Sequence, residues 1–142
     1  MQPNEQKEKC DFSCWVIRYD QVSIFGKTYR KDSLKDNDKK IVPLLWDHNH
    51  IDPDSILGYA LLENRAEGVY TYCTLNNVER RETAINLLKV PGTVSLSPYV
   101  TNVKYDKNFV VHGIIREVSL TPERLDPDEL YYPVLNKEVI DD

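Results

Sequence analysis

Short apolar segments separated by polar turns recur along most of this chain, and this pattern constrains the fold more than any other feature. In the segment 68–75, valine, threonine and cysteine fall on one side of an extended backbone and tyrosines on the other. Alternation with a period of two is typical of a β-strand. Strands are therefore expected at residues 13–19, 22–25, 41–46, 56–62, 68–75, 93–103, 109–112 and 114–120.

One segment follows a helical period instead. Residues 78–89 carry apolar side chains at roughly helical spacing, Asn76 and Asn77 are candidate N-caps, and Pro91-Gly92 ends the pattern. The chain is therefore expected to be mainly β with helices, in the α+β class. A succession of short strands favours an antiparallel β-barrel with one or more peripheral helices.

The length of 142 residues suits one domain with a single core. Residues 1–11 are largely polar and are expected to form a flexible N-terminal arm. Residues 12–122 hold the expected strands and helix and make up the barrel domain. Residues 123–142 are rich in acids and are expected to form a C-terminal tail.

The composition disfavours several classes of protein. A net charge of -5 does not suit wrapping of nucleic acid or binding to an anionic membrane. No apolar run approaches the roughly 20 residues that span a bilayer. The first nine residues are polar and charged, unlike a secretory signal, so a cytosolic location is expected. An odd number of cysteines in such a chain predicts reduced thiols at Cys10, Cys14 and Cys73.

Three separate segments carry side chains suited to nucleophilic catalysis. These are His48 after an apolar run, Ser95 and Ser97 inside one expected strand, and Glu117 inside another. A hydroxyl nucleophile, an imidazole base and a carboxylate that orients the base are the parts of an acyl-transfer site. Strand alternation puts Ser95 and Ser97 on the same side, so either hydroxyl is a candidate nucleophile.

Glu117 is expected either to lie on a solvated face of its strand or to have a partner, because a carboxylate among apolar side chains costs free energy unless it is hydrogen-bonded or paired. His48 and His112 are both candidate partners. Arg116 is expected on the opposite face of a regular strand and is therefore an unsuitable one.

A metal site is the competing interpretation of the histidines. His48-Asn49-His50 places two imidazoles on one side of an extended backbone. Further candidate ligands are Asp52, Asp54 and His112. The same three letters match the name of the His-Asn-His nucleases, but the residues of that motif are separated along the chain. The sequence therefore predicts no metal ion and no other cofactor, and a metal-dependent nuclease ranks third among the functions considered.

Four segments in the same order resemble the phage prohead proteases, the serine proteases of capsid maturation. They read VPLLWDHNH from Val42, LGYALLENRAEGVY from Leu57, VSLSPYV from Val94 and VVHGIIREVSL from Val110. The resemblance covers more than half of the chain. It implies a β-barrel surrounded by helices, related in fold to the herpesvirus assembly proteases.

The resemblance also assigns roles to individual residues. His48 fits the family's histidine after an apolar run, with Asp47 where asparagine is common. Ser97 fits the family's serine after a leucine, although Pro98 departs from the pattern. Glu117 takes the third position, which is a second histidine in the herpesvirus relatives. The implied site therefore has Ser97 as nucleophile, His48 as general base and Glu117 as orienting carboxylate.

The implied substrates are scaffold and capsid-protein extensions inside an assembling phage prohead, in the cytoplasm of a host bacterium or of one that carries the prophage. Capsid and scaffolding proteins are then the partners, and the helix-mediated dimers of the herpesvirus relatives imply a capacity for self-association. After Leu120 the chain has Thr121-Pro122 where relatives often have Ala-Asn-Pro. This departure and Pro98 motivate the alternative of a non-enzymatic capsid assembly or scaffolding protein on the same fold.

Overall fold

The computed structural model describes residues 7–22, 26–122 and 133–136, and in this part the chain is mainly β with few helices. The strands are β1 (Phe12–Arg18), β2 (Thr28–Tyr29), β3 (Ile41–Trp46), β4 (Ile56–Arg65), β5 (Gly68–Leu75), β6 (Ser95–Asp106), β7 (Phe109–Thr121) and β8 (Val134–Leu135). The helical elements are the 3-10 turns η1 (Lys35–Asn37) and η2 (Pro53–Ser55) and the helix α2 (Val78–Leu88). The expected strand 22–25 and tail 123–142 lie largely outside the described residues.

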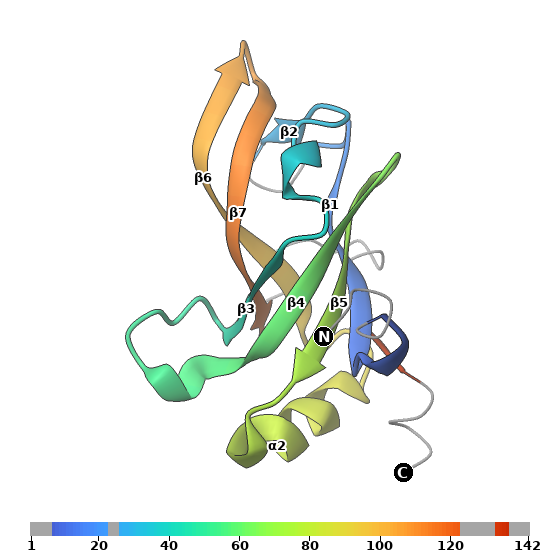
Figure 1. Cartoon of the computed structure of the whole chain (residues 1–142), viewed down its shortest axis with the longest axis vertical. Helices are drawn as coiled ribbons and strands as arrows, with labels where there is room; N and C mark the ends of the chain where they lie inside the picture. Colours follow the sequence, from blue (N-terminus) through green and yellow to red (C-terminus); the bar gives the residue numbers. More distant parts are fainter. Residues whose placement is uncertain (1–6, 23–25, 123–132, 137–142) are drawn as a thin grey trace.

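The strands form one mixed sheet in the order β2-β7-β3-β4-β5-β1-β8, with β6 on the other side of β7 (Figure 1). Most neighbours are antiparallel, but β2 and β3 run parallel to β7. The expectation of a wholly antiparallel sheet is therefore wrong. A long connection through β4, β5, α2 and β6 separates β3 from β7, so their pairing is not restricted to the antiparallel geometry of a hairpin. Among the described strands, no ladder joins β6 to β1 or β8, so a closed barrel is not shown.

The two faces of β3, β6 and β7 differ in chemistry. One face packs into the main hydrophobic core, where its side chains are almost fully buried: Val42, Leu44, Leu96, Val118 and Leu120. The alternate positions form what we call the site face, which carries Leu45 on β3, Ser97 on β6, and Glu117 and Ser119 on β7. The period of two thus puts the polar residues of β6 and β7 on one surface while their neighbours hold the sheet to the core.

Strand β7 is continuous through Gly113, where the sequence predicted an interruption. The buried side chain of Asn37 bridges the stretch of β7 between its β2 and β3 partners. Its amide donates to the carbonyl oxygen of Gly113 at 3.0 Å, and its carbonyl oxygen accepts from the backbone N–H of Ile115 at 3.0 Å. Because these buried backbone groups find partners in Asn37, the strand keeps its path as far as Glu117.

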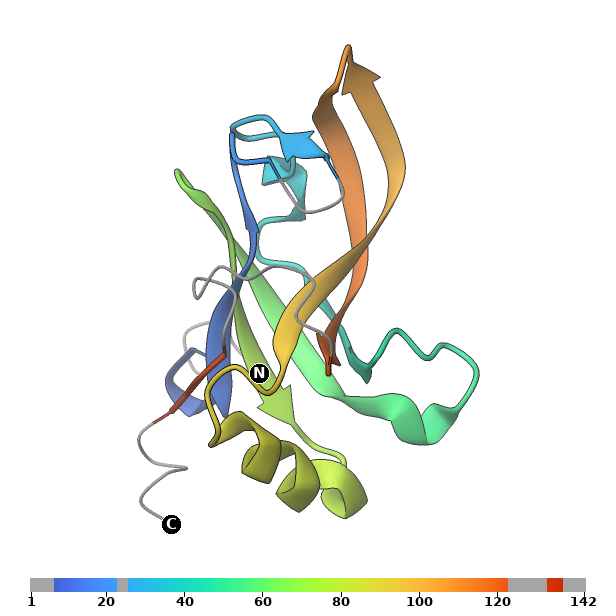
Figure 2. The same ribbon diagram turned by 180° about the vertical axis from the view of Figure 1, so that it is seen from behind.

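Helix α2 lies against the end of β5, as Figure 2 shows from behind. The side chain of Asn77 caps its first turn by accepting from the backbone N–H of Arg80 at 3.2 Å. Arg81 reaches back to the buried carboxylate of Asp11 at 2.8 Å, and that carboxylate also accepts from the N–H of Leu75 at 2.7 Å. Within the segment expected to be an arm, the described residues Cys10 and Asp11 are therefore packed against the sheet.

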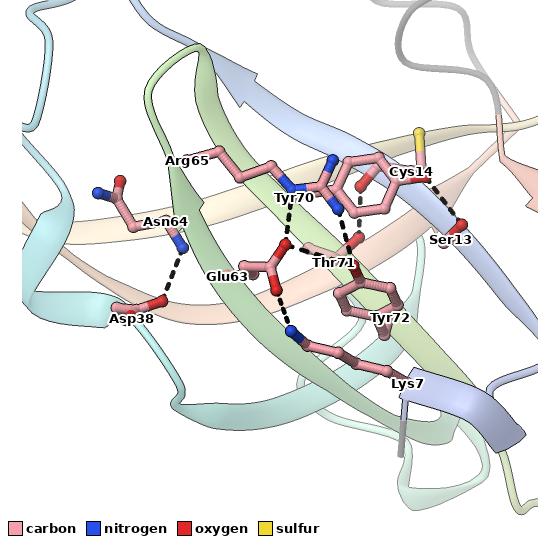
Figure 3. A network of polar contacts seen from close by, with 10 residues as sticks. All are labelled: Lys7, Ser13, Cys14, Asp38, Glu63, Asn64, Arg65, Tyr70, Thr71 and Tyr72. Carbon is pink, nitrogen blue, oxygen red and sulfur yellow. Dashed lines mark hydrogen bonds and ion pairs between the residues drawn. The ribbon is translucent and has the colours of Figure 1, made fainter. Parts of the chain in front are cut away.

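A second carboxylate organises the surface of the β4–β5 hairpin (Figure 3). Glu63 accepts from Arg65 Nε at 2.6 Å and from the Tyr72 hydroxyl at 3.3 Å, and it forms an ion pair with Lys7. The guanidinium of Arg65 lies over the ring of Tyr70, 4.0 Å from its centroid. We call Lys7, Glu63, Arg65 and Tyr72 the Glu63 network.

Candidate active site

The end of β3 turns sharply and presents His48 to the site face. Asp47 and His48 both have left-handed backbones, with φ of 50° and 54°. The N–H of Asn49 closes the turn on the carbonyl oxygen of Trp46 at 3.1 Å, and the N–H of Asp47 donates to Leu120 at 2.8 Å. Each left-handed position costs a non-glycine residue about 1–2 kcal/mol, a cost that often accompanies a functional site.

His48, Glu117 and Ser119 form one hydrogen-bonded cluster. Nδ1 of His48 lies 2.6 Å from Oε1 of Glu117, and the Ser119 hydroxyl donates to Oε2 at 2.9 Å. The same hydroxyl oxygen accepts from the backbone N–H of His48 at 3.1 Å. Glu117 is only 3% exposed, so both carboxylate oxygens are satisfied where water cannot easily reach them.

This contact sets the protonation chemistry of His48. The hydrogen bond to Glu117 raises the pKa of the imidazole, since it favours the charged ring, and burial opposes the shift. The charges of Glu117 and Asp47 add to the increase in pKa. In the neutral ring, Nδ1–H donates to the carboxylate and the lone pair is on Nε2. That tautomer is the one a general base requires.

Ser97 lies beside this cluster on the neighbouring strand. In the β6–β7 ladder Ser97 is opposite Ser119, and Tyr99 is opposite Glu117. Directly opposed side chains share one face with their Cβ atoms about 4.5–5.5 Å apart. Ser97 is partly exposed, and within the described part of the chain its hydroxyl makes no hydrogen bond, to His48 or to any other group. The structure thus brings His48 and Glu117 into contact and puts Ser97 on the adjacent ladder position.

Ser95 has a different environment although it shares the face of Ser97. It is 3% exposed, and its hydroxyl lies 3.2 Å from that of Thr121, the residue opposite it in the ladder. A hydroxyl in that position is buried and engaged, whereas the Ser97 side chain is open to solvent. Burial therefore favours Ser97, a distinction that strand alternation by itself does not make.

The other histidines take separate positions. His50 Nε2 is 3.5 Å from Oε1 of Glu117, and its half-exposed ring meets Tyr99 edge-on at 5.3 Å between centroids. His112 lies toward the other end of β7, with Nδ1 4.0 Å from Asp36. Among the candidate partners of Glu117, His48 makes the close contact and His112 makes none.

The described residues contain no group of three or more histidine, cysteine, aspartate or glutamate side chains placed to hold a metal ion. Asp52, one of the candidate ligands, instead accepts from the N–H of Asp54 at 2.9 Å and caps η2. The three cysteines form no disulfide and are buried. Burial raises the pKa of the Cys14 and Cys73 thiols, so these groups stay protonated and do not serve as nucleophiles.

A cavity of about 570 Å³ adjoins the cluster on the side of His50, and Glu117 forms part of its wall. The β6–β7 register passes from Tyr99–Glu117 to Val100–Ile115, so Arg116 is an extra residue in a β-bulge. The bulge turns Arg116 toward the same side as Glu117, and both line the cavity. The expectation that Arg116 faces away is therefore wrong. The expectation assumed an unbroken period of two, and nothing in the sequence marks the bulge.

Comparisons with protein-family models, with curated proteins and with solved structures found no match. In the part of the chain that the structure describes, no helix is both long and apolar enough to cross a bilayer.

Proposed function

We propose that this chain is a serine endopeptidase in which Ser97 is the nucleophile, His48 the general base and Glu117 the orienting carboxylate. The observation that carries the proposal is the 2.6 Å contact between His48 Nδ1 and Glu117. Nε2 of His48 is not engaged by this carboxylate, and the partly exposed Ser97 lies opposite Ser119 on the neighbouring strand β6. A carboxylate, an imidazole and a hydroxyl in this order are the parts of a catalytic triad.

The chemistry follows from these positions. Nε2 of His48 takes the proton of the Ser97 hydroxyl as its oxygen attacks the peptide carbonyl carbon, and later gives that proton to the leaving amine. Glu117 stabilises the imidazolium formed between these steps, and the hydrogen bond from Ser119 keeps the carboxylate in place. Water then hydrolyses the acyl-enzyme with His48 again as base. Binding of a substrate brings Ser97 and His48 together, since catalytic hydrogen bonds are often loose in an empty site.

The resemblance to prohead proteases supports the biological setting. The proposed substrates are extensions of scaffold and capsid proteins, cleaved inside an assembling phage prohead in a bacterial cytoplasm. The proposal includes a barrel of the herpesvirus-protease type. In support, β6 and β1 lie near opposite ends of the strand order and yet contact each other, although no ladder connects them among the described residues.

The test is cleavage of a proteome-derived peptide library, read by mass spectrometry of the new termini. Wild-type protein should generate cleavages, Ser97→Ala should generate none above background, and Ser95→Ala should resemble wild type. Ser97→Ala and Ser95→Ala are matched variants, because both remove one hydroxyl from the same strand. Equal cleavage by wild type and Ser97→Ala would reject the assignment.

A second candidate is a non-enzymatic capsid assembly or scaffolding protein. Two observations favour it. Among the described residues, Ser97 makes no hydrogen bond to His48, and Pro98 directly follows the serine. This alternative predicts no library cleavage by a folded sample that still associates with capsid proteins.

A further inference from the structure

Arg116 is a cationic side chain held in the wall of the cavity beside the proposed catalytic cluster. The β-bulge places it on the site face next to Glu117. Its Nε donates to the hydroxyl of Thr101 at 2.7 Å, and Thr101 lines the same cavity. One edge of the guanidinium is therefore fixed by the protein, and the terminal nitrogens remain available to a ligand.

No carboxylate of the described residues forms an ion pair with Arg116. Glu117 is its neighbour in the chain, but both oxygens of Glu117 are engaged by His48 and Ser119. Asp52 also lines the cavity, where its carboxylate caps η2. A guanidinium fixed at one edge and unpaired at the other suits a planar anion, and carboxylates bind such a fork through two parallel hydrogen bonds.

The rest of the cavity wall is mostly apolar. Pro43 and Leu45 contribute from β3, and Ile51 and Ile56 contribute from the loop and strand that follow. Ile51 is 95% exposed and Ile56 46% exposed, so both offer apolar surface to a ligand. A wall of this kind receives the methylene groups of a side chain while Arg116 binds its charged end.

We propose that Arg116 is a specificity-determining residue that binds an aspartate or glutamate side chain of the peptide substrate, close to the scissile bond. The inference rests on the proposed endopeptidase function and names the substrate chemistry of the same site. Because the cavity adjoins Glu117, the acidic residue lies within a few positions of the bond that Ser97 attacks.

The experiment uses the peptide library and one matched pair of peptides drawn from its cleaved sequences, differing only in Glu or Gln at the selected position. Wild type should show an acidic residue enriched at one fixed position, and kcat/KM for the Glu peptide should exceed that for the Gln peptide by about 10–100-fold, mainly through KM. Arg116→Ala should bring this ratio to about one. Arg116→Glu should prefer a Lys peptide, a reversal that a structural role for Arg116 does not predict.

Arg80→Glu, a charge reversal on the exposed surface of α2, is the control and should keep the wild-type ratio. Thermal unfolding of each variant checks that the variant keeps the wild-type fold. Cleavage without an acidic preference, or an unchanged Glu-to-Gln ratio in Arg116→Ala, would overturn the inference and leave the endopeptidase in place. Absence of any Ser97-dependent cleavage by wild type would overturn both, and the library result separates the two cases.

Discussion

Two glutamates organise polar networks in this molecule, and their partners differ in kind. Glu63, on the surface of β4, is held by the permanent cations Lys7 and Arg65. Glu117, on β7, is held by a titratable imidazole and a serine hydroxyl. The side chain of Glu63 is 22% exposed and that of Glu117 is 4% exposed.

The difference lies in whether the partners of the carboxylate can exchange a proton near neutral pH. Burial by itself would raise the pKa of Glu63, but hydrogen bonds from Lys7 and Arg65 outweigh it and lower the pKa. Cations that never lose their charge stabilise the carboxylate but transfer no proton at neutral pH. His48, in contrast, exchanges a proton near neutral pH and keeps one ring nitrogen for a substrate. If only the Glu117 cluster supports catalysis, substitutions in the Glu63 network should leave activity nearly unchanged.

Replacing His48 should have the largest effect on activity. His48→Asn keeps a residue that tolerates the left-handed backbone but removes the base, so kcat should fall by about 10⁵-fold. His50→Asn is the matched control, because the His50 ring lies 3.5 Å from Glu117 without the close contact, and kcat should fall less than about tenfold. Steady-state peptide cleavage measures both, and equal losses would place the base elsewhere.

Replacing each glutamate by glutamine should separate the two networks. Glu117→Gln keeps the shape but removes the charge that stabilises the imidazolium, so kcat should fall by about 10³–10⁴-fold. Glu63→Gln should leave kcat within about twofold, because its network contains no group of the proposed mechanism. A comparable loss of activity in Glu63→Gln would show that the effect is one of folding.

The pH dependence should follow His48. Its pKa is raised from the ordinary value of 6.5, so the acid limb of kcat/KM should have its midpoint above 6.5. Glu117→Gln removes the cause of the increase in pKa, and the midpoint should move downward. An acid limb that is unchanged in this variant would contradict the assignment of His48 as base.

The same contact affects stability with a defined sign. Because the folded-state pKa of His48 is raised, its contribution to stability is fully present below about pH 6.5 and is lost as the pH rises through the folded value. Stability from this pair therefore decreases over the range in which the neutral imidazole forms.

The smallest effect is expected at Glu63. Its pairs are partly exposed, so Glu63→Gln should lower the free energy of unfolding by about 1 kcal/mol or less at pH 7. The pKa of Glu63 is lowered, so this contribution is present above the unfolded-state pKa and is lost as the pH falls through the folded value. The free energies of unfolding of wild type and variant, measured in urea, should therefore converge in acid, and a difference that stays constant with pH would contradict a role for the Glu63 ion pairs.

Much of the fold follows from the alternation of side chains. The ends of β3 and β5 agree with the expected segments, and α2 ends one residue early. The parallel contact of β3 with β7 was not predictable, because it depends on how distant segments meet rather than on local pattern. The continuity of β7 through Gly113 likewise depends on Asn37, which lies 76 residues away in the sequence.

The candidate site also contains some features that the sequence predicted and others that it did not. A carboxylate within an apolar strand left Glu117 either solvated or paired, and in the structure it is paired with His48. The roles of His48, Ser97 and Glu117 in catalysis stay a prediction. Ser119 could have been found two residues after Glu117 on the same face. The placement of Arg116 could not, because a β-bulge leaves no signal in the hydrophobic pattern.

Ser97 is proposed as an activated nucleophile, and covalent labelling measures that reactivity. Folded protein is treated with a fluorophosphonate, its intact mass is measured, and the adduct is located by peptide mapping. A single adduct is expected on Ser97, abolished in Ser97→Ala and in His48→Asn and retained in Ser95→Ala. An absence of adduct on folded wild-type protein, or an adduct that persists in Ser97→Ala, would contradict the role proposed for Ser97.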